Sequence, residues 1–174
     1  MIELIKSNKI KFGILLCISV CILVIIMIFK YRKNNVLYPT SIDKAREYKT
    51  LIDVYKPNKS TFQILNDTFS VNEAWSGYLL TPRDDNGNRE IMKDIKLFNV
   101  SIINKYDEPY LYITEDIDLN FYFEMNSRRI RGGLRSNILN GQLKNNKLDT
   151  VKLFFYRYNR DEETILDSLS FIKQ

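Results

Sequence analysis

The segment LNFYFEM, residues 119–125, alternates apolar and polar side chains with a period of two. Such alternation is typical of a β-strand that buries one face and exposes the other. Val151–Tyr158 is apolar or aromatic on both faces, which predicts a strand at the centre of a sheet. Around Leu97 the apolar residues change phase, and this predicts a β-bulge or a bend.

Turn residues connect the predicted strands. Asp84–Gly87 contains an Asn-Gly pair, typical of a type I′ turn, and separates Trp75–Leu80 from Ile91–Ile103, so a hairpin is predicted. The same turn has the spacing of a calcium loop, but Arg89 stands where that loop needs glycine. Two further strands and two further turns are predicted at Tyr110–Thr114, Ile165–Phe171, Asn145-Asn146 and Asn159–Asp161.

One amphipathic helix is predicted before the sheet. Thr40 and Asp43 have the spacing of a capping box, and apolar residues recur at helical steps over Ile42–Tyr55 until Pro57. We predict that its apolar stripe packs on the sheet; a partner-binding stripe is the alternative. The expected fold class is α+β, mainly β: a transmembrane helix, this helix, then an antiparallel sheet meander or a small barrel-like curled sheet.

The most apolar stretch is FGILLCISVCILVIIMIF, residues 12–29. As a helix it would be roughly 27 Å long, close to the ~30 Å hydrocarbon core of a bilayer. No A-x-A-like cleavage site follows, so a retained anchor is predicted rather than a signal peptide. The predicted organisation is a short N-terminal tail (1–11), a transmembrane helix (12–29), a juxtamembrane linker (30–40) and one β-rich domain with a leading helix (41–174).

The charges around this stretch leave its orientation open. Three lysines precede it, and three basic residues follow within 30–33. Further basic residues at 44–49 on the C-terminal side would favour a cytoplasmic domain, because positive charges tend to remain in the cytoplasm. Large domains, however, cross the membrane with little regard to charge. We therefore predict a single-pass protein of the bacterial inner membrane with a periplasmic C-terminal domain.

The excess of positive charge belongs to the membrane flanks. Residues 1–33 hold six of the 26 basic residues and one of the 21 acidic residues, which leaves equal numbers of both signs in 34–174. A nucleic-acid-binding domain would carry a basic face of its own, whereas these flanks suit anionic headgroups. The lipid bilayer is therefore a predicted partner, and nucleic acid is not.

The residue types restrict the chemistry. The chain has no histidine, and Cys17 and Cys21 both lie inside the apolar stretch, which excludes histidine-based catalysis and a disulfide in the displayed domain. Asp116 and Asp118 are the remaining candidates for acid–base catalysis, although such pairs are common on strand surfaces. We predict no enzymatic activity, no cofactor, no metal and no small-molecule substrate.

The richest polar stretch is SRRIRGGLR, Ser127–Arg135. Guanidinium groups bind carboxylate or phosphate, and the glycines would let backbone N–H groups approach an anion. A partner-binding site is predicted at Arg128, Arg129, Arg131 and Arg135. Alternatively, these arginines pair with the acidic residues of 107–108 and 115–118. Tryptophan and tyrosine occur both in cores and at interfaces, and the sequence does not decide between these for six aromatic residues: Trp75, Tyr78, Tyr110, Tyr112, Tyr156 and Tyr158.

The whole chain combines a lysine-bearing N-terminus with one anchor (KIKFGILLCISVCILVIIMIFKYRKNN), a juxtamembrane helix (SIDKAREYKTLIDVYK) and a strand-rich domain. This layout resembles that of bacterial ToxS-like and FidL-like inner-membrane proteins. The resemblance implies a non-enzymatic periplasmic domain. ToxS-like members bind and protect the sensory domain of a membrane-bound transcription regulator.

We therefore predict a non-enzymatic accessory protein whose exported domain binds and stabilises a membrane-protein or periplasmic partner, such as a membrane-bound transcription regulator. The alternative is an immunity protein that neutralises a toxin delivered to the periplasm. A carboxylate-dependent enzyme that uses Asp116 and Asp118 is a third hypothesis.

Overall fold

The computed structural model divides the chain into two compact units. One comprises Met1–Leu37 and Thr81–Glu90, and the other comprises Tyr38–Leu80 and Ile91–Gln174. The described residues are 17–25, 27, 35–64, 67–104, 106, 120–135, 138–143, 149–159 and 162–174. Outside them lie the predicted tail 1–11, the ends of the predicted anchor, the strand Tyr110–Thr114, the turn Asn145-Asn146, the acidic residues of 107–108 and 115–118, and two residues of the turn Asn159–Asp161.

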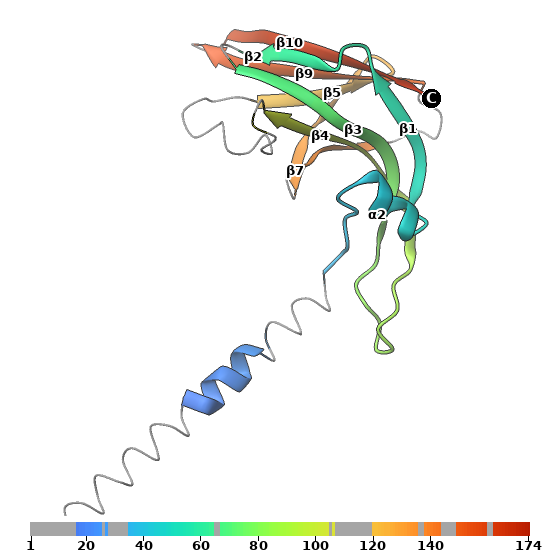
Figure 1. Ribbon diagram of the computed structural model, residues 1–174, viewed down its shortest axis with the longest axis vertical. Coiled ribbons are helices and arrows are strands. Elements are labelled where there is room, and N and C mark those ends of the chain that lie inside the picture. The colour runs from blue at the N-terminus through green and yellow to red at the C-terminus, as the bar shows by residue number, and fades with distance from the viewer. Residues whose placement is uncertain are drawn as a thin grey trace, which may run out of the picture. The chain divides into compact units, whose positions relative to one another are not determined.

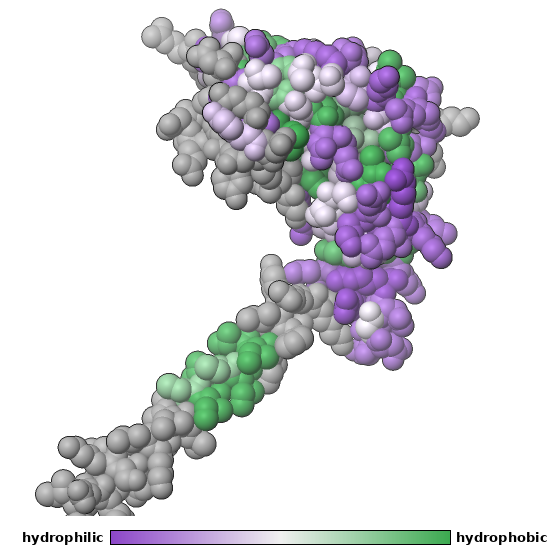
Figure 2. All heavy atoms as spheres, viewed as in Figure 1, coloured by the Kyte–Doolittle hydropathy of each residue, from purple (hydrophilic) through white to green (hydrophobic). Residues whose placement is uncertain are grey.

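In the first unit, residues 17–25 and 27 are helical. Their large apolar side chains are about half exposed or more, from 49% for Val24 to 69% for Met27. Figure 2 shows this segment in green, the apolar end of the scale. Among the described residues, no helix combines the length and the hydropathy that crossing a bilayer requires.

The same unit contains the turn predicted from the Asn-Gly pair. The N–H of Gly87 donates to the carbonyl of Asp84 (3.1 Å), and the N–H of Asp84 donates to the carbonyl of Asn88 (2.9 Å). Gly87 has a φ of +85°, whereas Asn86 does not have a positive φ. A type I′ turn needs positive φ at both central residues, so this loop matches a type I turn followed by a bulge instead.

The second unit is an antiparallel sheet that curls into a nearly closed barrel (Figure 1). Along the sheet the strand order is β6-β5-β9-β10-β1-β3-β4-β8-β7, and β2 pairs with β3. The strands are β1 (Leu51–Pro57), β2 (Thr61–Ile64), β3 (Asp67–Leu80), β4 (Ile91–Asn104), β5 (Asn120–Met125), β6 (Arg128–Arg131), β7 (Gly133–Arg135), β8 (Ile138–Leu143), β9 (Thr150–Asn159) and β10 (Glu162–Lys173). The predicted mainly β class and the predicted hairpin are therefore confirmed.

The connectivity is a meander only in part. Consecutive strands pair in β2–β3, β3–β4, β5–β6, β7–β8 and β9–β10. Strands that do not follow each other in the chain also pair: β1 with β3 and β10, β4 with β8, and β5 with β9. The two ends of the strand order, β6 and β7, follow each other in the chain and are joined at Gly132. A Cβ at Gly132 would lie 2.0 Å from the ring of Phe121, so glycine at this junction leaves room for that ring.

Alternation along the strands decides which side chains face the interior. In β5, Phe123 and Met125 are buried, whereas Tyr122 and Glu124 are only partly buried. The strand β9 lies between β5 and β10, which confirms the predicted central position of Val151–Tyr158.

Aromatic rings fill the interior. The ring of Phe98 lies 5.0 Å from that of Tyr55, 5.6 Å from that of Phe123 and 5.4 Å from that of Phe171. Gly141 leaves room for the ring of Phe123, since a Cβ there would lie 2.6 Å from it. Such close packing of large rings makes this cluster a main source of the stability of the barrel.

The predicted irregularity near Leu97 lies in β4. Tyr78 of β3 pairs with Lys96, but the next residue, Leu79, pairs with Met92. The extra residues of β4 form a bulge beside the predicted position, and they shift the phase of the side chains that follow.

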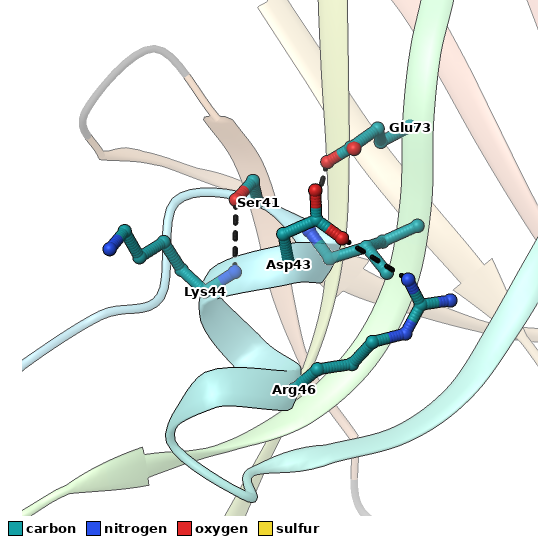
Figure 3. A network of polar contacts seen from close by, with 6 residues as sticks. Ser41, Asp43, Lys44, Arg46 and Glu73 are labelled. Carbon is teal, nitrogen blue, oxygen red and sulfur yellow. Dashed lines mark hydrogen bonds and ion pairs between the residues drawn. The ribbon is translucent and has the colours of Figure 1, made fainter.

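The helix α2 spans Ile42–Glu47 and contacts β1 and β3 (Figure 1). Its N-cap is Ser41, whose Oγ accepts a hydrogen bond from the N–H of Lys44 at 3.1 Å (Figure 3). The predicted cap at Thr40 is thus wrong by one residue. The first N–H of the helix donates to a carboxylate oxygen of Glu73 at 2.9 Å, which satisfies another backbone donor of the first turn.

The predicted continuation of this helix to Tyr55 is wrong. Lys49 has a φ of +55°, and the chain enters β1 at Leu51. The first part of β1, Leu51–Val54, pairs with β3, and the last part, Tyr55–Pro57, pairs with β10, so hydrogen bonds of a sheet replace those that a helix would supply. A short run of apolar residues fits helix and strand alike, and here the strand pairing decides.

A small second core joins α2 to the outer face of the sheet. It consists of the buried Ala45, Trp75 and Ile138, with Ile42 and Leu51 packed against them. The apolar stripe of the helix therefore packs on the sheet, as predicted. The indole N–H of Trp75 forms no hydrogen bond with any described residue, and the side chain is fully buried.

Candidate functional site

The outer surface of β5 and β9 carries a row of aromatic side chains. Tyr122 pairs with Phe154 across the two strands, and their rings stack with centroids 5.0 Å apart. The ring of Tyr156 lies 5.6 Å from that of Tyr122 and 5.4 Å from that of Tyr158. Tyr158 is 56% exposed, whereas Leu153 on the opposite face of β9 is fully buried. The aromatic row is therefore accessible and does not belong to the core.

Arg129 of the neighbouring strand β6 completes this surface. Its guanidinium carbon lies 3.7 Å from the ring centroid of Tyr122 and 4.8 Å from that of Tyr156. Its Nη1 also lies 2.7 Å from Oε2 of Glu163, which comes from β10. Stacking and ion pairing together fix this arginine in one position. We call the following set the Tyr–Arg face: Tyr122, Arg129, Arg131, Phe154, Tyr156 and Tyr158.

A cavity of about 570 Å³ opens on this face. Its lining residues are Asn120, Phe121, Tyr122, Arg129, Arg131, Gly132 and Tyr156. Since a Cβ at Gly132 would meet the ring of Phe121, the absence of a side chain at this glycine leaves that ring uncovered in the lining of the cavity. Partial burial raises the pKa of Tyr122, and the charge of Arg129 opposes this shift, so the phenol keeps its proton at neutral pH and can donate a hydrogen bond.

The structure separates the four arginines of the predicted site. Arg129 and Arg131 line the same cavity. Arg128 is exposed and points to the other side of β6. Arg135 lies on β7, where its guanidinium carbon stacks 3.6 Å from the ring centroid of Tyr38. The described acidic partner of this stretch is Glu163, a residue that the sequence analysis did not single out.

A second polar group of residues lies at one end of the barrel. Nζ of Lys173 lies 2.8 Å from Oδ1 of Asp53, and Nζ of Lys96 lies 3.9 Å from Oδ2 of the same carboxylate. The side chains of Lys96 and Asp53 are 8% and 14% exposed. Burial lowers the pKa of Lys96, and the charge of Asp53 opposes this shift. We call Asp53, Lys96 and Lys173 the barrel-end cluster, which the sequence analysis missed.

Among the residues that the structure describes, no group of three or more acidic, cysteine or histidine side chains could hold a metal ion. The carboxylate of Asp84, in the turn compared with a calcium loop, accepts the N–H of Asn88 at 2.7 Å and closes the turn. Asp116 and Asp118 lie outside the described residues.

The second unit thus forms a nearly closed antiparallel barrel with an aromatic and arginine-bearing outer face. Comparisons with known protein families, curated proteins and solved structures find no match for this chain. The resemblance of its layout to ToxS-like and FidL-like proteins therefore stays a prediction.

Proposed function

We propose that this chain is a single-pass, non-enzymatic accessory protein of the bacterial inner membrane. Its periplasmic β-barrel binds and stabilises a membrane-protein partner, such as a membrane-bound transcription regulator. The observation that carries this proposal is the Tyr–Arg face, where the partly buried Tyr122 and Tyr156 stack on the exposed Arg129. Tyrosine and arginine are enriched among the residues that dominate binding energy at protein interfaces.

The geometry of this face favours tight binding. Holding a flexible side chain in place during association costs free energy, so a surface that is fixed beforehand binds better. Arg129 is held by two rings and by Glu163 before any partner arrives. The tyrosine rings offer broad contact area with little loss of conformational freedom.

The proposed anchor rests on the apolar stretch 12–29 and on the exposure of its described part. A helix whose large apolar side chains are half exposed in the folded chain would gain free energy in a bilayer, because each buried CH₂ contributes about 0.8 kcal/mol. The proposed partner, being a membrane protein, would then lie within reach of the barrel.

We expect the full-length protein to stay in the membrane fraction after a wash with alkaline carbonate. A helical anchor resists this wash, whereas a peripherally bound protein is released. Alkaline phosphatase fused after Gln174 should be active, because that enzyme needs an oxidising compartment for its disulfides. Release of the intact chain by carbonate would contradict the proposed anchor, and an inactive fusion would contradict the periplasmic orientation.

We expect Tyr122→Ala and Tyr156→Ala each to abolish most of the recovery of a membrane-protein partner in pulldowns from detergent extracts. Each change removes a ring that stacks on Arg129, and loss of such an interface residue costs about 2 kcal/mol or more, roughly thirtyfold in affinity. The measurement is the amount of partner recovered per bait by quantitative mass spectrometry.

Tyr38→Ala is the matched control. Tyr38 also stacks on an arginine, Arg135, at 3.6 Å, but it does not line the cavity of the Tyr–Arg face. The control variant should therefore recover the partner as the unchanged protein does. A bait that stays free of any stoichiometric membrane protein, or an equal loss with Tyr38→Ala, would count against the proposed function.

A further inference from the structure

Ion pairs account for part of the charge on the described residues of the Tyr–Arg face and its borders. Glu163 pairs with Arg129 at 2.7 Å, and Glu124 pairs with Lys152 at 3.4 Å. Arg131 forms no ion pair with any described residue. Within the described residues, the guanidinium group of Arg131 therefore has no carboxylate at ion-pair distance.

This arginine lies at the cavity described above. Arg131 stands opposite Tyr122 in the β5–β6 pairing, and both residues line the cavity of about 570 Å³. Arg129 lines the same cavity, but Glu163 already occupies one edge of its guanidinium group. Among the described residues that line the cavity, Arg131 is therefore the guanidinium group without an ion-pair partner.

We propose that the cavity binds a carboxylate side chain of an acidic segment in the partner protein, with Arg131 as the group that receives it. This inference rests on the proposed function and specifies the chemistry of its partner. A guanidinium group can bind a carboxylate through two parallel hydrogen bonds. The methylene groups of a glutamate would pack on Phe121, which Gly132 leaves uncovered at the cavity.

The surface next to the cavity favours a protein segment over a free small anion. Beyond Tyr156 the outer face continues with Tyr158, which is 56% exposed, and Ile165, which is 44% exposed. Ile165 pairs with Tyr156 and therefore lies on the same face of the sheet. A segment with acidic and apolar residues would contact this strip and the cavity together.

The direct test uses purified full-length protein in a nonionic detergent and a fluorescein-labelled hexaglutamate peptide. Fluorescence anisotropy at low ionic strength should show saturable binding, and a hexaglutamine peptide should not bind. Arg131→Glu should weaken hexaglutamate binding by about tenfold or more, which corresponds to 1.4 kcal/mol or more. Arg131→Lys should weaken hexaglutamate binding less than Arg131→Glu does, because lysine keeps the positive charge and loses only the bidentate hydrogen bonding of the guanidinium group.

Arg83→Glu is the control for net charge, since Arg83 is exposed and does not line the cavity. It should bind hexaglutamate as the unchanged protein does, and the emission of the buried Trp75 should confirm that all variants are folded. Absence of hexaglutamate binding, equal binding by Arg131→Glu, or an equal loss with Arg83→Glu would each overturn the inference.

These outcomes are distinct from those of the pulldown. If a membrane partner is recovered while hexaglutamate does not bind, the proposed acidic segment is wrong and the accessory function stands. If hexaglutamate binds through Arg131 and no partner is recovered, the anion site stands and the accessory function is wrong.

Discussion

Asp53→Asn is expected to lower the free energy of unfolding by about 3 kcal/mol, as the loss of one partner from a buried ion pair does. The carboxylate of Asp53 forms ion pairs with two lysines. Its Oδ1 lies 2.8 Å from Nζ of Lys173, and its Oδ2 lies 3.9 Å from Nζ of Lys96. The asparagine keeps the size of the side chain but removes the carboxylate that faces the buried ammonium group of Lys96 and the partly exposed one of Lys173. Urea denaturation followed by the emission of Trp75 measures the change.

Lys96→Met is the counterpart that separates the two lysines. It should leave the free energy of unfolding unchanged or raise it, because Asp53 keeps its 2.8 Å contact with Lys173 and a desolvated charge is removed. A loss as large as that of Asp53→Asn would show that Lys96 and Asp53 act as a stabilising pair, against this expectation.

The pH dependence of the unchanged protein gives a second reading of Lys96. Burial lowers the pKa of Lys96 in the folded protein. At pH values below that folded pKa, Lys96 is charged in the folded state, and the burial of this charge lowers the free energy of unfolding by its full amount. The cost is relieved as pH rises from the folded pKa toward the ordinary lysine value, since the unfolded chain then binds more protons. The unchanged protein should therefore gain stability relative to Lys96→Met over that alkaline range.

The β-strands could be predicted wherever burial on one face sets the pattern. In β5 the inward Phe123 alternates with the outward Tyr122, and both the strand and its partly buried character follow from that alternation. The helix α2 was harder to delimit, because the apolar residues after Glu47 also fit helical steps. What ends it is the pairing of β1 with β3 and β10, which are distant in sequence.

The candidate site could be predicted only in part. The arginine-rich stretch was found from its composition, but alternation along β6 and the bend at Gly132 direct Arg128 and Arg135 away from Arg129. The partner of Arg129, Glu163, is brought close only by the pairing of β9 with β10. Local sequence patterns contain no information about such registers between strands.

The barrel-end cluster did leave a signal in the sequence. Lys96 lies two residues before Phe98 and therefore shares its inward phase along β4. A lysine in phase with buried apolar residues predicts a buried charge that needs an acidic neighbour. Which acid supplies it, Asp53 in this case, depends on strand order and could not be read locally.

Phe98→Ala is expected to have the largest effect of all, a loss of about 4 kcal/mol in the free energy of unfolding, within the range for deleting a buried aromatic ring. The ring of Phe98 is fully buried and contacts the rings of Tyr55, Phe123 and Phe171. Its removal leaves a cavity between three large rings that pack on it, and large rigid rings refill such a cavity poorly. In a protein of ordinary stability this loss would leave a measurable unfolded fraction, visible in the emission of Trp75 without denaturant.

Tyr158→Ala provides the contrast, because Tyr158 is 56% exposed and its ring contact with Tyr156 lies on the outer face. It should change the free energy of unfolding by less than about 1 kcal/mol. Similar losses for both variants would mean that the aromatic interior does not dominate the stability of the barrel. A small loss with Phe98→Ala alone would mean that the interior collapses around the cavity, which the packing of Phe123 against Gly141 argues against.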